Sequence, residues 1–253
     1  MTASLDDVGV ILAPTMRSRA YMQMMEARGL RVSQAFLIPG ADRPWNGPAE
    51  IAVLLPNGAT PFVLRPGEYA RETVERMNLP ARSLPHADIN HPSTIAALER
   101  SGPRVLVYSG LPKVLLRPPV LATGIRFLHV HGGYVPHYRG ATAFYFGLLT
   151  EGKLGQSAIW LDAGVDTGPL LMRRWYDVTP GLSVDQVLDP VTRADLLATV
   201  LRHFADTGHF PAAEDSAEGE KFFIIHPVLK HLALRRVTRS AASPPLRGGA
   251  QHV

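Results

Sequence analysis

A strand, helix, strand unit at the start of the chain constrains the fold more than any other feature. A short apolar run at 8–13 is followed by a stretch at 16–28 with apolar residues at helical spacing, and then by the alternating segment 30–38. Alternation with a period of two indicates a strand, and apolar residues one helical turn apart indicate a helix. Two strands joined by a helix form the unit of a parallel sheet wound with helices. The opening therefore predicts an α/β fold.

The rest of the chain continues the alternation of strands and helices. We predict a Rossmann-like α/β domain over residues 1–178, with a mostly parallel sheet and helices on both faces. A mostly helical C-terminal extension follows over 179–234, in which a helix at 183–207 is broken at Pro190. The proline-rich segment 41–66 has no assigned role. We expect strands at 51–55, 62–64, 81–84, 104–108, 125–130 and 157–162, and helices at 68–77, 92–100 and 141–151.

The net positive charge of the chain lies at its C-terminal end. The formal net charge is +4, and residues 235–253 contain four arginines and no acidic residue. This segment is also rich in Ser, Pro, Gly and Ala, a composition typical of disordered chain ends. We therefore expect a disordered tail at 235–253 and no binding of nucleic acid.

Two absences exclude several classes of protein. The sequence contains no cysteine, which excludes disulfides, thiolate nucleophiles and Cys-ligated zinc. The N-terminus has acidic residues where a secretory signal needs basic ones, and the run 8–13 is far shorter than the about 20 residues that cross a bilayer. We expect a cytoplasmic protein that does not bind membranes.

Two histidines and two aspartates form the most informative constellation. His129 and His131 lie at the end of the predicted strand 125–130, two residues apart, so their side chains share one face. Asp162 and Asp166 lie in a glycine-rich loop after another predicted strand, which we expect at the same edge of the sheet. A carboxylate beside a histidine orients the imidazole and raises its basicity, as a proton shuttle requires. The pattern predicts an acid-base site.

The same residues allow a second interpretation. His129, His131 and Asp166 would offer two nitrogens and one oxygen to a divalent ion, as in a metal-dependent hydrolase. The sequence shows no further recognisable ligand set, so we expect no metal and keep the hydrolase as the alternative.

The order and spacing of four short motifs resemble the formyltransferases that use 10-formyltetrahydrofolate. The motifs are Val105-Leu-Val-Tyr108-Ser-Gly-Leu-Pro-Lys113, the strand end at His131, Val135-Pro136-His137-Tyr138-Arg139-Gly140, and Asp162-Ala-Gly-Val-Asp166-Thr-Gly-Pro169. The resemblance covers residues 104–171, and the N-terminal unit only in general form.

The resemblance implies a reaction and roles for individual residues. An amine attacks the formyl carbon on N10 of the folate, His131 moves protons, and Asp166 supports the His131 imidazolium. His129 occupies the place of an asparagine that donates a hydrogen bond to the formyl oxygen, and an imidazole N–H can also donate to an oxyanion. Gly133 stands where many members carry a small hydroxyl residue. The residues implied in cofactor binding are Tyr108, Gly110, Leu111, Asp162, Gly164 and Val165.

The acceptor is the least determined part of this prediction. Because only 87 residues follow Asp166, we expect no β-barrel domain of the kind that tRNA-acting members carry. A small-molecule amine, such as an amino sugar nucleotide or a biosynthetic intermediate, is the expected acceptor. The segment 221–234 is a candidate for acceptor binding or for a homodimer contact. The change at His129 also leaves open a non-catalytic folate-binding module on the same fold.

Overall fold

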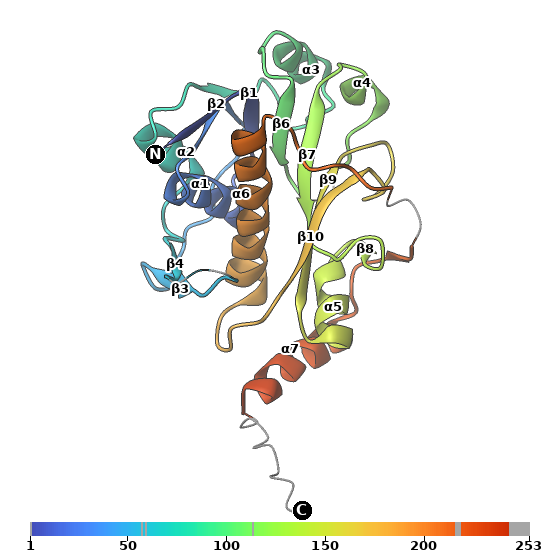
Figure 1. Ribbon diagram of the computed structural model, residues 1–253. Coiled ribbons are helices and arrows are strands. Elements are labelled where there is room, and N and C mark those ends of the chain that lie inside the picture. The colour runs from blue at the N-terminus through green and yellow to red at the C-terminus, as the bar shows by residue number, and fades with distance from the viewer. Residues whose placement is uncertain (1, 57, 59, 113, 216–218, 243–253) are drawn as a thin grey trace, which may run out of the picture.

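The computed structural model describes residues 2–56, 58, 60–112, 114–215 and 219–242, and its centre is a seven-stranded sheet (Figure 1). The strand order is β10-β9-β7-β6-β1-β2-β5. The four successive pairs from β5 through β2, β1 and β6 to β7 are all parallel. The predicted mostly parallel α/β sheet is therefore confirmed. The strands are β1 (Ala3–Leu12), β2 (Leu30–Leu37), β5 (Ala81–Ser83), β6 (Val105–Ser109), β7 (Arg126–His131), β9 (Leu154–Trp160) and β10 (Leu170–Tyr176).

Alternating side chains of the strands build two cores, one on each face of the sheet. On β1, Val10 belongs to one buried cluster and Ile11 to the other. The same division separates Leu128 from Phe127 on β7. Because successive residues of a strand point to opposite faces, a central strand buried on both sides reads as a continuous apolar run. This explains the apolar runs in the second half of β1 and in β6.

Two long helices cover one face of the sheet. Helix α1 (Met16–Ala27) begins after Thr15, whose hydroxyl accepts a hydrogen bond from the backbone N–H of Ser18 and caps the helix. Helix α6 (Asp189–Thr207) packs beside α1 and against β9, β10, β1 and β7 (Figure 1). It thus forms a layer of the α/β unit, although the sequence assigns it to an extension that starts at residue 179.

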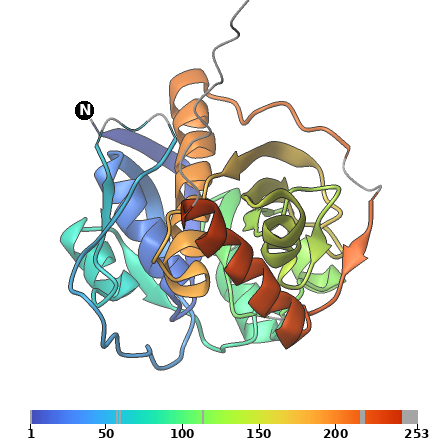
Figure 2. The ribbon, with the colours of Figure 1, turned by 90° about the horizontal axis from the view of Figure 1, so that it is seen from below.

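The remaining elements are helices and short strands outside the main sheet and its two long helices. Strands β3 and β4 pair as a short antiparallel hairpin within the proline-rich segment, and α7 packs beside α5 at one end of the molecule (Figure 2). These elements are β3 (Ile51–Val53), β4 (Phe62–Leu64), α2 (Ala70–Arg76), α3 (Pro92–Glu99), α4 (Pro118–Leu121), β8 (Arg139–Gly140), α5 (Ala143–Glu151), β11 (Lys221–Phe222) and α7 (Pro227–Ala242).

Three details of the C-terminal half differ from the sequence prediction. Strand β9 is antiparallel to both β7 and β10. Pro190 does not break a helix: it lies in the first turn of α6, where no backbone N–H is needed, and a π-helical turn, η1 (Val184–Leu188), precedes it. Helix α7 continues to Ala242, so residues 235–242 of the predicted disordered tail are helical, and 243–253 lie outside the described residues.

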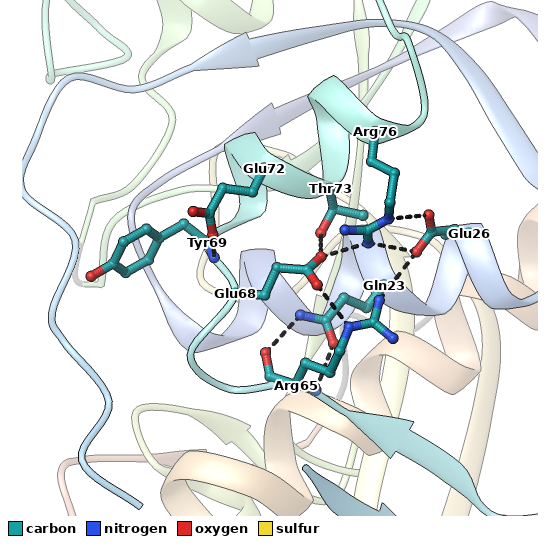
Figure 3. A network of polar contacts seen from close by, with 8 residues as sticks. All are labelled: Gln23, Glu26, Arg65, Glu68, Tyr69, Glu72, Thr73 and Arg76. Atoms are coloured by element: carbon teal, nitrogen blue, oxygen red, sulfur yellow. Dashed lines mark hydrogen bonds and ion pairs between the residues drawn. The ribbon is translucent and has the colours of Figure 1, made fainter. Parts of the chain in front are cut away.

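A polar network fastens α2 and the end of the proline-rich segment to α1 (Figure 3). Glu68 receives hydrogen bonds from Arg65, Thr73 and Arg76, and Arg76 also forms a two-pronged pair with Glu26 of α1. Although partial burial opposes ionisation, hydrogen bonds from Arg76, Arg65 and Thr73 lower the pKa of Glu68 to about 2. The network adds charge-assisted hydrogen bonds to the apolar contacts that Leu64 and Val74 make with the main core.

Candidate active site

The centre of the site is a pair formed by His131 and Asp166. Nδ1 of His131 lies 3.2 Å from Oδ2 of Asp166. The same carboxylate oxygen accepts a hydrogen bond from the backbone N–H of Gly140 at 3.1 Å. Burial opposes ionisation of Asp166, but the neighbouring His131, His129 and the Gly140 N–H hold the pKa of its carboxyl below the ordinary value. Asp166 is therefore a partly buried carboxylate directed at an imidazole.

The second nitrogen of His131 also meets an oxygen. Nε2 lies 3.1 Å from the carbonyl oxygen of Tyr138. Because a carboxylate and a carbonyl only accept hydrogen bonds, both contacts are satisfied together when each ring nitrogen carries a proton. Both ring nitrogens are thus directed at hydrogen-bond acceptors. Exchange of the Tyr138 contact for a substrate group makes the proton on Nε2 available for transfer.

His129 has a different environment from His131. Its Nδ1 lies 3.1 Å from the carbonyl oxygen of Tyr108, an acceptor, so Nδ1 carries the hydrogen of this bond. Burial, reinforced by the positive charge of Arg17, lowers the pKa of His129 to about 3. The ring is therefore neutral near pH 7, and its Nε2 carries a lone pair and no hydrogen. This arrangement does not supply the free N–H donor that the family resemblance implies for His129.

The path by which Asp166 reaches His131 differs from the expected one. Strand β9 ends at Trp160, which pairs with Leu128 in the middle of β7, because the two strands are antiparallel. The following loop must therefore turn back along β7 to reach His131. Asp166 adopts a left-handed conformation with φ of 54° at this return, and Asp162 shapes the loop by accepting hydrogen bonds from Gly164 N and the Thr167 hydroxyl.

The glycine pair after β7 leaves room for the two flanking side chains. A Cβ on Gly132 would lie 2.2 Å from a guanidinium nitrogen of Arg193. A Cβ on Gly133 would lie 2.2 Å from the Tyr138 carbonyl oxygen and 2.6 Å from Nε2 of His131. Both distances are shorter than any normal contact. Gly133 therefore permits the close approach between His131 and Tyr138, and a larger residue there would need a shifted loop.

A cleft of about 230 Å³ opens at His129 and Asp166. One wall is apolar, and it contains Leu111, Leu116 and Leu161. Among the six residues predicted to bind the cofactor, five line this cleft: Tyr108, Leu111, Asp162, Gly164 and Val165. The sixth, Gly110, is not a lining residue; it lies against the ring of Tyr108 and accepts a hydrogen bond from Arg17. Lys113 of the same motif lies outside the described residues.

Sequence reasoning missed Arg17, which lines the cleft from the start of α1. Its Nε donates to the hydroxyl of Ser109 at 3.1 Å, and NH2 donates to the carbonyl of Gly110. The signal available in the sequence was its position directly after the first strand, at the edge of the sheet where α/β proteins bind ligands.

The three residues of the metal interpretation do come together. Each of His129, His131 and Asp166 offers a ligand atom within 4.8 Å of the others. However, both nitrogens of His131 and Oδ2 of Asp166 are already bonded to protein groups. Of the four ring nitrogens of His129 and His131, only Nε2 of His129 has a lone pair and no protein partner among the described residues. The contacts therefore favour the acid-base site over a three-ligand metal site.

Comparison with known proteins agrees with this geometry. A family model described as formyl transferase matches residues 37–201. Two similar curated proteins are methionyl-tRNA formyltransferases, one from Ruminiclostridium cellulolyticum (23% identical, 52% of this chain and 43% of the relative) and one from Chloroflexus aurantiacus (29% identical, 54% and 45%). The chain thus spans less than half the length of these relatives.

Solved structures show the same fold. A glycinamide ribonucleotide transformylase from Symbiobacterium toebii aligns with a TM-score of 0.55 at 19% identity, over 81% of this chain and 88% of that one. A sugar N-formyltransferase from a Shewanella species aligns with a TM-score of 0.52 at 12% identity, over 91% and 87%.

An imidazole–carboxylate pair, His131 and Asp166, thus lies beside a cleft on a mostly parallel α/β sheet. The chain belongs to the formyl transferase family, because the family model matches well over half of it. The family takes its formyl group from 10-formyltetrahydrofolate. Within the described residues, no helix is both long enough and apolar enough to cross a bilayer.

Proposed function

We propose that this protein transfers a formyl group from 10-formyltetrahydrofolate to the amine of a small molecule. The observation that carries the proposal is the position of the His131–Asp166 pair, whose carboxylate forms one end of the cleft lined by the predicted folate-binding residues. An acid-base pair beside a partly apolar cleft is the arrangement expected for acyl transfer from a flat, heterocyclic donor.

The cleft fits the folate on two further counts. The buried hydroxyl of Tyr108 has no hydrogen-bond partner among the described residues, although it belongs to a residue that lines the cleft. Buried polar groups are rarely left unpaired, so a polar atom of a bound ligand is the expected partner. The apolar wall of Leu111, Leu116 and Leu161 is suited to one face of a ring system. When bound, the folate supplies an activated formyl group.

The protein's own residues then manage protons and charge. His131 passes a proton between the attacking amine and the nitrogen that leaves, after its contact with the Tyr138 carbonyl is released. Asp166 orients the ring and stabilises the imidazolium. The apolar wall limits water near the site, which strengthens these interactions.

The acceptor is proposed as a small molecule on two grounds. The structural neighbours named above include a glycinamide ribonucleotide transformylase and a sugar N-formyltransferase, whose names identify small acceptors. The site is a cleft of limited volume, and the excess of basic over acidic residues in the sequence lies at 235–253. The cytoplasmic location, the homodimer and the absence of nucleic acid binding remain predictions.

The test is calorimetric titration with 5-formyltetrahydrofolate, a stable analogue of the donor. We expect saturable binding by the wild type and weaker binding by Leu111→Asn, which places an amide in the apolar wall. Leu54→Asn is the matched control, because Leu54 is 64% exposed and does not line the cleft. Absence of binding by the wild type would contradict the proposed function. Binding without turnover of any amine would favour the non-catalytic folate-binding module.

A further inference from the structure

The formyl oxygen needs a hydrogen-bond donor in this reaction, and His129 does not offer one. The neutral ring has a single N–H, on Nδ1, and the Tyr108 carbonyl accepts it. Its Nε2 can only accept. An asparagine at this position would present an N–H donor to the cleft. With His129 in its place, the cleft has an acceptor there and no donor.

Arg17 lines the same cleft and has N–H donors that its described contacts do not use. A guanidinium has five N–H groups, and the described contacts of Arg17 use one to the Ser109 hydroxyl and one to the Gly110 carbonyl. Both partners are neutral, and no carboxylate pairs with Arg17 in the part of the chain that the structure describes. The guanidinium is therefore fixed in place by neutral partners, and Asp189 acts on its charge without a direct ion pair.

The position of Arg17 in its helix supports a functional role. It lies in the first turn of α1, which contains no acidic residue. A cation at the positive end of a helix dipole is unfavourable. Unfavourable local placements such as this one occur at functional sites. A negative charge that develops in the cleft would offset the unfavourable interaction of Arg17 with the helix dipole.

We propose that Arg17 donates the hydrogen bond to the formyl oxygen, and that Nε2 of His129 accepts one from the N–H of the incoming amine. The inference rests on the proposed function. As the amine nitrogen bonds to the formyl carbon, the electron pair of the C=O bond moves to the oxygen beside the guanidinium. When the bond from the formyl carbon to N10 breaks, its electron pair stays on N10. The proton lost by the amine reaches N10 through His131, and His129 only orients the amine.

The first test measures the tautomer of His129 without any substrate. Long-range ¹H–¹⁵N correlation spectra of the labelled protein, assigned with His129→Asn, report which ring nitrogen carries hydrogen. We expect hydrogen on Nδ1 and a bare Nε2 between pH 6 and 8, about the range in which ordinary histidines titrate. The charged groups acting on this ring are Arg17, Arg193 and Asp166. Hydrogen on Nε2 would overturn the proposal.

The second test uses hydroxylamine as the acceptor, because it has no anionic group that Arg17 could bind. Tetrahydrofolate formation from 10-formyltetrahydrofolate is followed for wild type, Arg17→Met and the control Arg82→Met, an exposed residue of β5. Loss of an oxyanion donor should lower kcat by about 100- to 1000-fold for Arg17→Met. The double variant R17M/H129N should recover at least about tenfold, because the amide restores a donor. Thermal melts confirm that each variant is folded.

The outcomes separate this inference from the proposed function. A wild type that neither binds 5-formyltetrahydrofolate nor releases tetrahydrofolate contradicts the proposed function itself. If the wild type is active, three results would contradict the role of Arg17 alone. These are an unchanged kcat for Arg17→Met, a defect of Arg17→Met only in KM for the folate, or a double variant R17M/H129N that is no faster than Arg17→Met.

Discussion

The imidazole of His131 and the carboxylate of Asp166 meet at 3.2 Å although the strands that precede them, β7 and β9, run in opposite directions. The contact depends on a loop that doubles back and on Asp166 in a left-handed conformation. It also depends on the Gly140 N–H, which holds the carboxylate in place. These supports make the pair a specific arrangement, and they determine which substitutions should disturb it.

Asp166→Asn should lower the rate of formyl transfer by about 100- to 10,000-fold, the usual contribution of acid-base catalysis. The amide keeps the size of the side chain but removes the charge that stabilises the His131 imidazolium. Steady-state tetrahydrofolate formation measures the loss, and titration with 5-formyltetrahydrofolate should show that binding persists. Asp177→Asn is the control, since Asp177 is 90% exposed. A variant within threefold of wild type would remove Asp166 from the mechanism.

Gly133→Ala should reduce turnover by about 100-fold, the effect of displacing a catalytic group by about 1 Å. The new Cβ would collide with the Tyr138 carbonyl and with Nε2 of His131, so the loop must move. We also expect a lower melting temperature. Gly67→Ala is the matched control, because nothing lies within 4 Å of its added Cβ. Unchanged kinetics for Gly133→Ala would show that the loop is free to adapt.

Removal of divalent metals should leave activity unchanged. The nitrogens of His131 and Oδ2 of Asp166 are committed to protein partners, which leaves no complete ligand set at the site. The measurement is tetrahydrofolate formation after dialysis against a chelator, with metal content determined before and after. Stoichiometric metal, together with activity that is lost on chelation and restored by zinc, would establish the hydrolase-like alternative.

Glu68→Gln should lower the free energy of unfolding by about 1 to 2 kcal/mol at pH 7, because its hydrogen bonds to Arg65 and Arg76 lose their charge. The pKa of Glu68 is about 2 in the folded protein, against an ordinary value of 4.5. A lowered folded-state pKa stabilises above pH 4.5, and this stabilisation is lost as the pH falls towards 2.

Urea denaturation at several pH values tests the role of Glu68. The wild type and Glu68→Gln should differ most near neutral pH and converge in acid. Glu99→Gln, at an exposed position of α3, is the control and should match the wild type throughout. A constant difference at all pH values would mean that the network acts through packing and not through charge.

Elements whose signals are local could be predicted from the order of residues alone. Alternation of apolar residues identified β2, and short apolar runs identified β1, β6 and β7, because the burial of a strand's faces is encoded in adjacent residues. The spacing of His129 and His131 indicated that they share a face, since the side-chain period of a strand is fixed at two. Short motifs in the right order indicated the family, and with it the cleft residues, five of which lie together.

Features that depend on neighbours distant in the chain could be identified only from the folded protein. The direction of β9 is set by its pairing with β7 and β10, and no local pattern specifies it. Helix α6 lies on the sheet because its apolar face fits beside α1. The hydrogen on His129 is assigned by a carbonyl of β6, and Arg17 joins the site only when β1 and β6 are adjacent. Residue type can be read from one position, whereas the proton, the partner and the charge at that position follow from everything packed around it.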